Sequence, residues 1–210
     1  MDRNEIYRHI DYTLLKPTAT SDEIYDLCVK AIDNNCASVC IPSSYVDFVH
    51  DLFPSLNICT VVGFPLGNSS TCTKVMEAMN AVIDGANEID MVMNIADLKS
   101  GHYTKIINEI NTVKSKSHAS ILKVIIETCY LTENEIAVAT QLISQSSAEF
   151  IKTSTGFGTR GASFKDIEII SKNIKYGLRI KASGGIRTYE DMVKYIDMGC
   201  ERIGASVLPQ

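Results

Sequence analysis

The chain has 210 residues, a formal charge of −5 at pH 7 and a sequence pI near 5.4. Its lysines and arginines are scattered, which excludes the basic face that nucleic acids require and the polybasic run that anionic membranes attract. The first ten residues, "MDRNEIYRHI", carry charges and lack the apolar segment of a signal peptide, and no apolar run approaches the roughly 18 residues of a membrane-spanning helix. We therefore expect a cytoplasmic protein with no nucleic-acid or membrane partner.

The cysteines and histidines show no pattern typical of a metal site. Seven cysteines are present, an odd number, with no CxxC pair, and the four histidines lack metal-ligand spacing. Several cysteines lie within apolar runs, as reduced and buried thiols do. We expect no disulfide framework, no metal and no cofactor.

Short apolar runs rich in β-branched residues recur along the whole chain. They cover residues 10–15, 38–42, 57–64, 88–94, 121–128, 150–155, 179–185 and 202–207. Several segments between them have helical periodicity and recognisable ends. We expect a helix over 21–35 with Ser21 as N-cap, one over 132–146 with a capping box from Thr132 to Glu135, and one over 188–199 that Gly199 terminates.

Alternation of strands with helices predicts βαβ units and a parallel sheet. Parallel strands are covered on both faces and therefore read as continuous apolar runs, as these do. Eight such runs favour a closed (β/α)₈ barrel, the TIM barrel, over an open sheet. No linker rich in proline, glycine or serine divides the chain, so we expect residues 1–210 to form a single domain.

A charged residue recurs at matching places in four consecutive runs. "ILK", "FIK" and "RIK" begin at 121, 150 and 179, a step of 29 residues, and "EID" begins at 88. Lys123, Lys152, Lys181 and Asp90 are thus predicted to occupy equivalent positions on successive strands. Side chains at matching phase point to the same side of a barrel sheet, and a helix-covered outer face suits charges poorly. We expect these four groups inside the barrel, near its mouth.

Paired lysines in a partly dry site indicate carbonyl chemistry. A lysine of ordinary pKa, about 10.4, is protonated at neutral pH and is a poor nucleophile, but burial and a neighbouring cation favour the free amine. A free amine attacks a carbonyl to form a Schiff base, and a nearby carboxylate passes protons. An aldol, retro-aldol or dehydration step is therefore expected.

Glycines stand where the last two strands are predicted to end. Gly184 and Gly185 follow the seventh run, and Gly204 and Ser206 lie in the eighth. The loops after strands 7 and 8 are the usual phosphate site of such barrels, because glycine lets backbone N–H groups approach the anion. These four residues are candidates for binding a phosphorylated substrate.

The motifs "HIDYTLLKP", "EIDMVMN", "LKVIIET", "FIKTSTGF" and "KASGGIRT" together resemble the deoxyribose-phosphate aldolase family, over residues 9–207. The resemblance implies a (β/α)₈ barrel and a class I aldolase without metal. Such an enzyme cleaves 2-deoxy-D-ribose 5-phosphate to D-glyceraldehyde 3-phosphate and acetaldehyde, in deoxynucleoside catabolism. The expected partner is thus a phosphorylated deoxy sugar, and a homodimer is left open.

The resemblance also implies roles for individual residues. Lys152 matches the Schiff-base lysine, Lys181 the second lysine that perturbs it and relays protons, and Asp90 the proton-relay acid. The set expected to line the substrate pocket consists of Lys123, Thr13, Cys40, Thr155, Gly156, Gly184, Gly185, Gly204 and Ser206. One departure is visible: the chain ends "GASVLPQ" directly after the eighth run, where many family members continue into a closing helix or a tail with a tyrosine.

Other functions remain open at this point. One is a Schiff-base aldolase with a different phosphorylated sugar, and another is an isomerase-type phosphate-binding barrel in which the lysines act only electrostatically. A third is a barrel that binds a phosphorylated metabolite without reaction. Trapping of an imine separates the aldolases from the other two.

Overall fold

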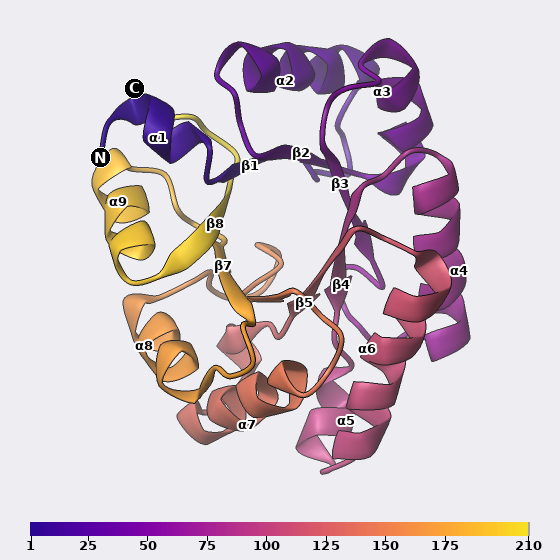
Figure 1. Cartoon of the computed structure of the whole chain (residues 1–210), viewed down its shortest axis with the longest axis vertical. Coiled ribbons are helices and arrows are strands. Elements are labelled where there is room, and N and C mark those ends of the chain that lie inside the picture. The colour runs from indigo at the N-terminus through magenta and orange to yellow at the C-terminus, as the bar shows by residue number, and fades with distance from the viewer. Residues whose placement is uncertain (210) are drawn as a thin grey trace.

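Eight parallel strands, β1 to β8, form a closed barrel in chain order (Figure 1). The computed structural model describes residues 1–209. The strands are β1 Ile10–Thr13, β2 Ser38–Ile41, β3 Ile58–Val62, β4 Glu88–Val92, β5 Ile121–Ile125, β6 Phe150–Lys152, β7 Arg179–Ser183 and β8 Cys200–Ala205. This architecture confirms the predicted (β/α)₈ barrel.

Most strands are shorter than the apolar runs that predict them. The run at 150–155 contains only the three residues of β6, because the chain leaves the ladder after Lys152. Gly156 has a left-handed φ of +88°, which turns the backbone toward the barrel mouth. The eighth run is displaced as well, since β8 begins at Cys200 and ends at Ala205.

Helices cover the outside of the barrel, as the alternating pattern predicts (Figure 1). They are α1 Arg3–Tyr7, α2 Ser21–Asp33, α3 Val46–Leu52, α4 Thr71–Ile83, α5 Ile95–Lys99, α6 Tyr103–Ser117, α7 Glu133–Ser144, α8 Phe164–Asn173 and α9 Tyr189–Asp197, with 3-10 turns η1 Ser43–Tyr45 and η2 Thr128–Tyr130. Within residues 1–209, no helix is long and apolar enough to cross a bilayer.

Two of three predicted helix ends are confirmed. Thr132 and Glu135 form the predicted capping box of α7, and Gly199, at φ +96°, follows the end of α9. The prediction of Ser21 as N-cap of α2 is wrong by one residue. Thr20 is the cap, because its backbone is extended while Ser21 is already helical, and the side chain of Thr20 accepts from the amide of Glu23.

The side of the barrel near β8 is closed differently from the others. Within the described residues 1–209, β8 is the last element. The short helix α1, which the sequence analysis did not predict, lies beside the end of the chain (Figure 1). The hydroxyl of Tyr7 donates to the carbonyl of Pro209 at 3.0 Å, and Ile6 is fully buried in the apolar core. Helix α1 therefore packs on the apolar core beside the segment that follows β8.

Strand register places the charged residues at two levels inside the barrel. Asp90 pairs with Lys123 and Lys152 pairs with Lys181, but Lys123 pairs with Phe150. The prediction that the three lysines occupy equivalent positions is right for the side of the sheet and wrong for the level. Strands in a barrel are tilted and staggered, so equal spacing in sequence does not give equal height.

We expect Ile6→Ala to lower the free energy of unfolding by about 2–5 kcal/mol, because it removes a buried side chain between α1 and the barrel. Ile6→Val should cost about 0.5–1.5 kcal/mol, and Tyr7→Phe about as much as one hydrogen bond, 0.5–1.5 kcal/mol. Chemical denaturation measures all three. Unchanged stability of Ile6→Ala would show that α1 is not part of the cover.

Candidate active site

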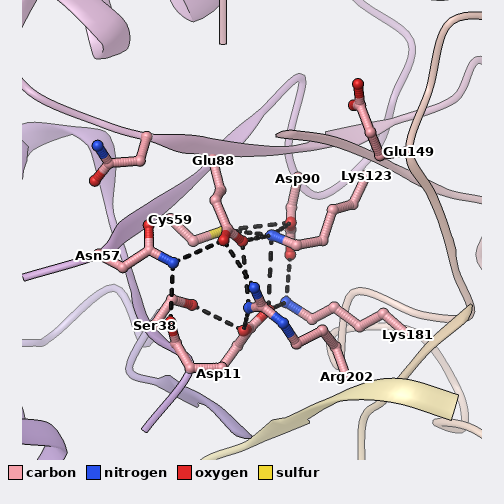
Figure 2. Close-up of polar contacts among 12 residues, drawn as sticks. Asp11, Ser38, Asn57, Cys59, Glu88, Asp90, Lys123, Glu149, Lys181 and Arg202 are labelled. Carbon is pink, nitrogen blue, oxygen red and sulfur yellow. Dashed lines mark hydrogen bonds and ion pairs between the residues drawn. The ribbon is translucent and has the colours of Figure 1, made fainter. Parts of the chain in front are cut away.

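Seven charged side chains meet inside the barrel, six of them shown in Figure 2. They come from six of the eight strands and are almost entirely buried. We call them the charge cluster: the carboxylates Asp11, Glu88 and Asp90, and the cations Lys123, Lys152, Lys181 and Arg202. An apolar barrel tolerates such charges only when each has partners of opposite sign.

Asp90 is the carboxylate that the three lysines share. Its Oδ2 accepts from Lys152 and from Lys181, each at 2.7 Å, and its Oδ1 accepts from Lys123 at 2.9 Å. Burial opposes ionisation of Asp90, but the three ammonium groups outweigh it and hold its pKa well below the usual range. The structure thus brings together the three residues that the sequence predicts as catalytic.

Lys181 lies between two carboxylates. Its ammonium contacts Oδ2 of Asp11 as well as Oδ2 of Asp90. Burial disfavours the charged form, yet Asp11 and Asp90 together raise the pKa of Lys181 above its ordinary value. Lys181 therefore remains a cation at neutral pH.

Lys123 lies below the other lysines and is fully buried. Its ammonium is 2.5 Å from Glu88 Oε2, 2.9 Å from Asp90 Oδ1 and 3.6 Å from Asp11 Oδ2. Lys123, which the sequence predicts in the substrate pocket, is not among the residues that line the cavity beside Lys152, and its amine contacts Asp90 instead.

A cavity of about 330 Å³ opens directly beside Lys152. Seven of the nine predicted pocket residues line it: Thr13, Thr155, Gly156, Gly184, Gly185, Gly204 and Ser206. The sequence analysis did not predict the other lining residues, which are Leu14, Leu15, Lys16, Phe157, Ser183, Ile186 and Arg187. Lys16 and Arg187 give this cavity two further positive charges.

Glycines after β7 present backbone N–H groups to the cavity. Gly184 and Gly185 have left-handed φ values of +85° and +77°. Within residues 1–209, the amides of Gly184, Gly185 and Ser206 donate to no backbone carbonyl. Two successive left-handed residues next to unpaired amides suit an anion.

Close packing between β7 and β8 also requires a glycine at position 204. A Cβ at this position would lie 2.8 Å from the Cβ of Ser183 and 3.3 Å from Cε of Lys181. Its lack of a side chain therefore lets β7 and β8 hold the Lys181 side chain in place.

Glu127 holds the loop that follows Lys152. Its backbone is left-handed (φ +50°), and its buried carboxylate accepts from the amide and the hydroxyl of Thr155. The Thr155 hydroxyl in turn accepts from the amide of Phe157 at 3.0 Å. Glu127 thus fixes one wall of the cavity without lining it.

Several functional candidates escaped the sequence analysis. Asp11, Glu88 and Arg202 each interrupt an apolar run, in "IDYT", "EID" and "ERIG", which is the same signal that singles out the strand lysines. Glu88 precedes Asp90 by two residues and so shares its face of β4.

Two groups of three possible metal ligands lie among the described residues: Cys40, Cys59 and Asp90, and Asp11, Cys59 and Glu88. The ammonium of Lys123 contacts members of both groups, including Cys59 Sγ at 3.3 Å. A cation there would be repelled, so neither group fits a metal. Cys40, which the sequence predicts in the substrate pocket, is buried beside Cys59 and is not among the residues that line the cavity.

All seven cysteines lie within the described residues, and none is paired with another there. Cys28, Cys40, Cys59 and Cys200 are buried, and Cys72 is exposed.

Residues 9–207 match the family model described as DeoC/LacD family aldolase. The chain belongs to this aldolase family. It is 50% identical over 207 residues to a protein named deoxyribose-phosphate aldolase from Clostridium botulinum (strain Alaska E43 / Type E3), covering 98% of this chain and 94% of the relative. A protein of the same name from Clostridioides difficile (strain 630) is 46% identical over 202 residues, with 96% and 92% covered.

Solved structures of aldolases are similar across the whole barrel. An aldolase titled QR15 is 37% identical, with a TM-score of 0.92 over 96% of this chain and 91% of that one. The deoxyribose phosphate aldolase from Aeropyrum pernix, whose title describes a tetramer, is 28% identical, with a TM-score of 0.88 over 98% and 88%.

We expect Lys123→Leu to lower the free energy of unfolding at pH 7 by about 3–5 kcal/mol, because it takes one cation from each of three buried carboxylates. Asp90, whose pKa is depressed in the folded protein, stabilises the fold above pH ~4 and loses this contribution as the pH falls. The difference in unfolding free energy between Lys123→Leu and the native protein should therefore become smaller below pH ~4. Lys99→Leu, which removes an exposed pair with Glu135, is the control and should cost at most about 1 kcal/mol. Equal losses in the two variants would contradict the stabilising role of Lys123.

Proposed function

We propose that this aldolase cleaves 2-deoxy-D-ribose 5-phosphate to D-glyceraldehyde 3-phosphate and acetaldehyde, with Lys152 as the residue that forms the Schiff base. The observation that carries the assignment is the position of the Lys152 amine. It is the one amine of the charge cluster that lines the cavity, and it contacts Asp90 below.

Lys152 is also the cation of the cluster that is held least firmly. It pairs with one carboxylate, whereas Lys181 and Arg202 each pair with two and Lys123 with three. Loss of a proton from Lys152 therefore breaks the fewest ion pairs. A free amine at this point can attack the C1 aldehyde of the open-chain sugar.

Asp90 and Lys181 are suited to move protons around that amine. Asp90 Oδ2 accepts from both lysines. It therefore orients the Lys152 amine and connects it to the ammonium group of Lys181. Lys181 supplies a proton for the loss of water from the carbinolamine, and Asp90 passes it on. In the next step the 3-hydroxyl gives up its proton, and the C2–C3 bond breaks as its electrons enter the imine.

The products follow from that cleavage. Glyceraldehyde 3-phosphate leaves with C3 to C5, and the enamine of C1 and C2 remains on Lys152. Protonation at C2 regenerates an imine, and water releases acetaldehyde and the free amine. Each proton that is taken up or released can be exchanged through Asp90, Lys181 and water.

The phosphate fits the opposite end of the cavity. The loop at Gly184 and Gly185 offers backbone N–H groups, Ser206 offers a hydroxyl, and Arg187 and Lys16 add positive charge. Anchoring the phosphate there places the sugar carbonyl for attack by Lys152, and such positioning contributes substantially to catalysis.

Reductive trapping tests the proposed function. We expect acetaldehyde or substrate plus borohydride to attach irreversibly to Lys152 and to abolish activity, and peptide mapping to locate the adduct. Lys152→Leu should give no adduct, and acetaldehyde release should persist with EDTA present. An adduct on Lys181 or Lys123 instead would overturn the assignment of roles.

The phosphate site makes a separate prediction. Gly185→Val should reduce kcat/KM for deoxyribose 5-phosphate far more than for unphosphorylated deoxyribose, because a β-branched residue is strained at the left-handed φ of +77° and would displace the backbone N–H groups of this loop. Ser206→Ala should cost about 1–3 kcal/mol of transition-state binding, as expected for a hydrogen bond to a charged group. The ratio of kcat/KM for the two sugars is the measurement. An unchanged ratio in Gly185→Val would place the phosphate elsewhere.

Three expectations from the sequence stay predictions. They are a single domain over residues 1–210, a cytoplasmic location and a homodimer. Analytical ultracentrifugation would decide the last.

A further inference from the structure

The charge cluster has an odd number of members and cannot be neutral when all are ionised. Four cations face three carboxylates, which leaves one unbalanced positive charge in a site that is almost completely shielded from water. Removal of one proton from a cation gives three charges of each sign. The cluster is therefore balanced when one of its amines is neutral.

Glu88 and Arg202 contribute to this balance through direct contacts inside the charge cluster (Figure 2). Arg202 Nη2 donates to Glu88 Oε1 at 2.9 Å, and Nη1 of Arg202 contacts Asp11 Oδ1. Glu88 Oε2 is 2.5 Å from the ammonium of Lys123. Neither residue lines the cavity, so neither is placed to touch a substrate.

Both residues are held firmly in place by their contacts. Burial disfavours the charged form of Arg202, but Asp11 and Glu88 outweigh it and raise the pKa of Arg202 above its ordinary value. Glu88 is fixed from its other side by Asn57, whose amide donates to Glu88 Oε1 at 2.7 Å. A pair fixed in this way can act on Lys152 through the electric field alone.

We propose that Glu88 and Arg202 are positioning residues whose opposite charges compensate each other and keep the excess of the cluster at one positive charge, so that the balanced state is the one in which Lys152 carries a free amine. This inference rests on the proposed function of Lys152. It gives two residues that do not line the cavity a role in the reaction at Lys152.

The sign of each effect follows from Coulomb's law. Neutralising Glu88 makes the cluster more positive, which favours the free amine, so the acid limb of the activity profile should move to lower pH. Neutralising Arg202 has the opposite effect. A unit charge within about 10 Å, at an effective dielectric constant of about 20, shifts a titration by on the order of one to two pH units.

Charged and titratable groups surround Lys152 from every side. The set that acts on it from the barrel strands and the mouth comprises Asp11 (β1), Cys40 (β2), Cys59 (β3), Glu88 and Asp90 (β4), Lys123 (β5), Lys181 (β7), Arg202 (β8), Lys16 and Arg187. The variants below change only Glu88 and Arg202, so the contributions of the others stay constant.

The test is the pH dependence of kcat/KM for cleavage of deoxyribose 5-phosphate, since its acid limb reports ionisation of the free enzyme. We expect Glu88→Gln to move the acid limb down by about one pH unit and Arg202→Gln to move it up by about one pH unit. The double variant restores the native excess of one positive charge and should lie near the native profile. Arg202→Lys keeps the charge and should leave the limb in place.

Matched controls separate the cluster from a general change in charge. Glu149→Gln removes a carboxylate that pairs with Lys114 at 2.6 Å, and Arg179→Gln removes a guanidinium that pairs with Glu201 at 2.9 Å. The side chains of Glu149 and Arg179 are 29% and 35% exposed, so solvent screens them. Both controls should shift the acid limb by less than about 0.3 pH units.

The proposal is supported if the acid limb moves in opposite directions in Glu88→Gln and Arg202→Gln and returns in the double variant. Loss of structure alone would lower activity without moving the acid limb in opposite directions. Glu88→Gln is nearly isosteric, so its profile decides the matter even if Arg202→Gln does not fold. An unmoved acid limb in Glu88→Gln, with borohydride still trapping Lys152, would overturn this inference and leave the proposed function intact. Absence of a Lys152 adduct in the native protein would instead overturn the proposed function.

Discussion

The shared carboxylate of Asp90 is the interaction on which the rest of the site depends. Three ammonium groups approach its two oxygens, and none of these groups has appreciable contact with solvent. Buried charges of this kind cost several kcal/mol each to desolvate, so they are stable only as an alternating network. Asp11, Glu88 and Arg202 complete that network, and removal of any one takes a charged partner from at least two of its neighbours.

The same network separates the site into two levels with different tasks. The lower level comprises Lys123, Glu88 and Arg202, none of which lines the cavity, and their ion pairs hold these charges in place. The upper level, with Lys152 and Lys181 paired in register, opens to the cavity. This division follows from the stagger of β5 against β6, which raises Lys152 above Lys123 although the spacing in sequence is regular. A rigid charged floor under a reactive amine is a form of preorganisation, since the charges need not move during reaction.

The walls of the cavity are held by backbone conformation and hydrogen bonds, whereas the charge cluster is held by ion pairs. The β7 loop is defined by glycines with left-handed backbones, which leave amides free for an anion. The β6 loop is instead held by Glu127, whose own strained backbone is fixed by the contacts of its carboxylate with Thr155. Backbone strain of this kind is typical of residues that support a functional site.

The sequence alone determined the fold class, the family and the set of strand lysines with Asp90, because buried parallel strands and charges within them leave clear local patterns. It also marked the glycines after β7. Only the tertiary structure decided that Lys123 lies under the site and that Arg202 joins Asp11 and Glu88. Those facts depend on strand stagger and on contacts between residues nearly 200 positions apart, such as Asp11 and Arg202. No local pattern encodes the height of a strand in a closed barrel, because the tilt of all eight strands fixes it together.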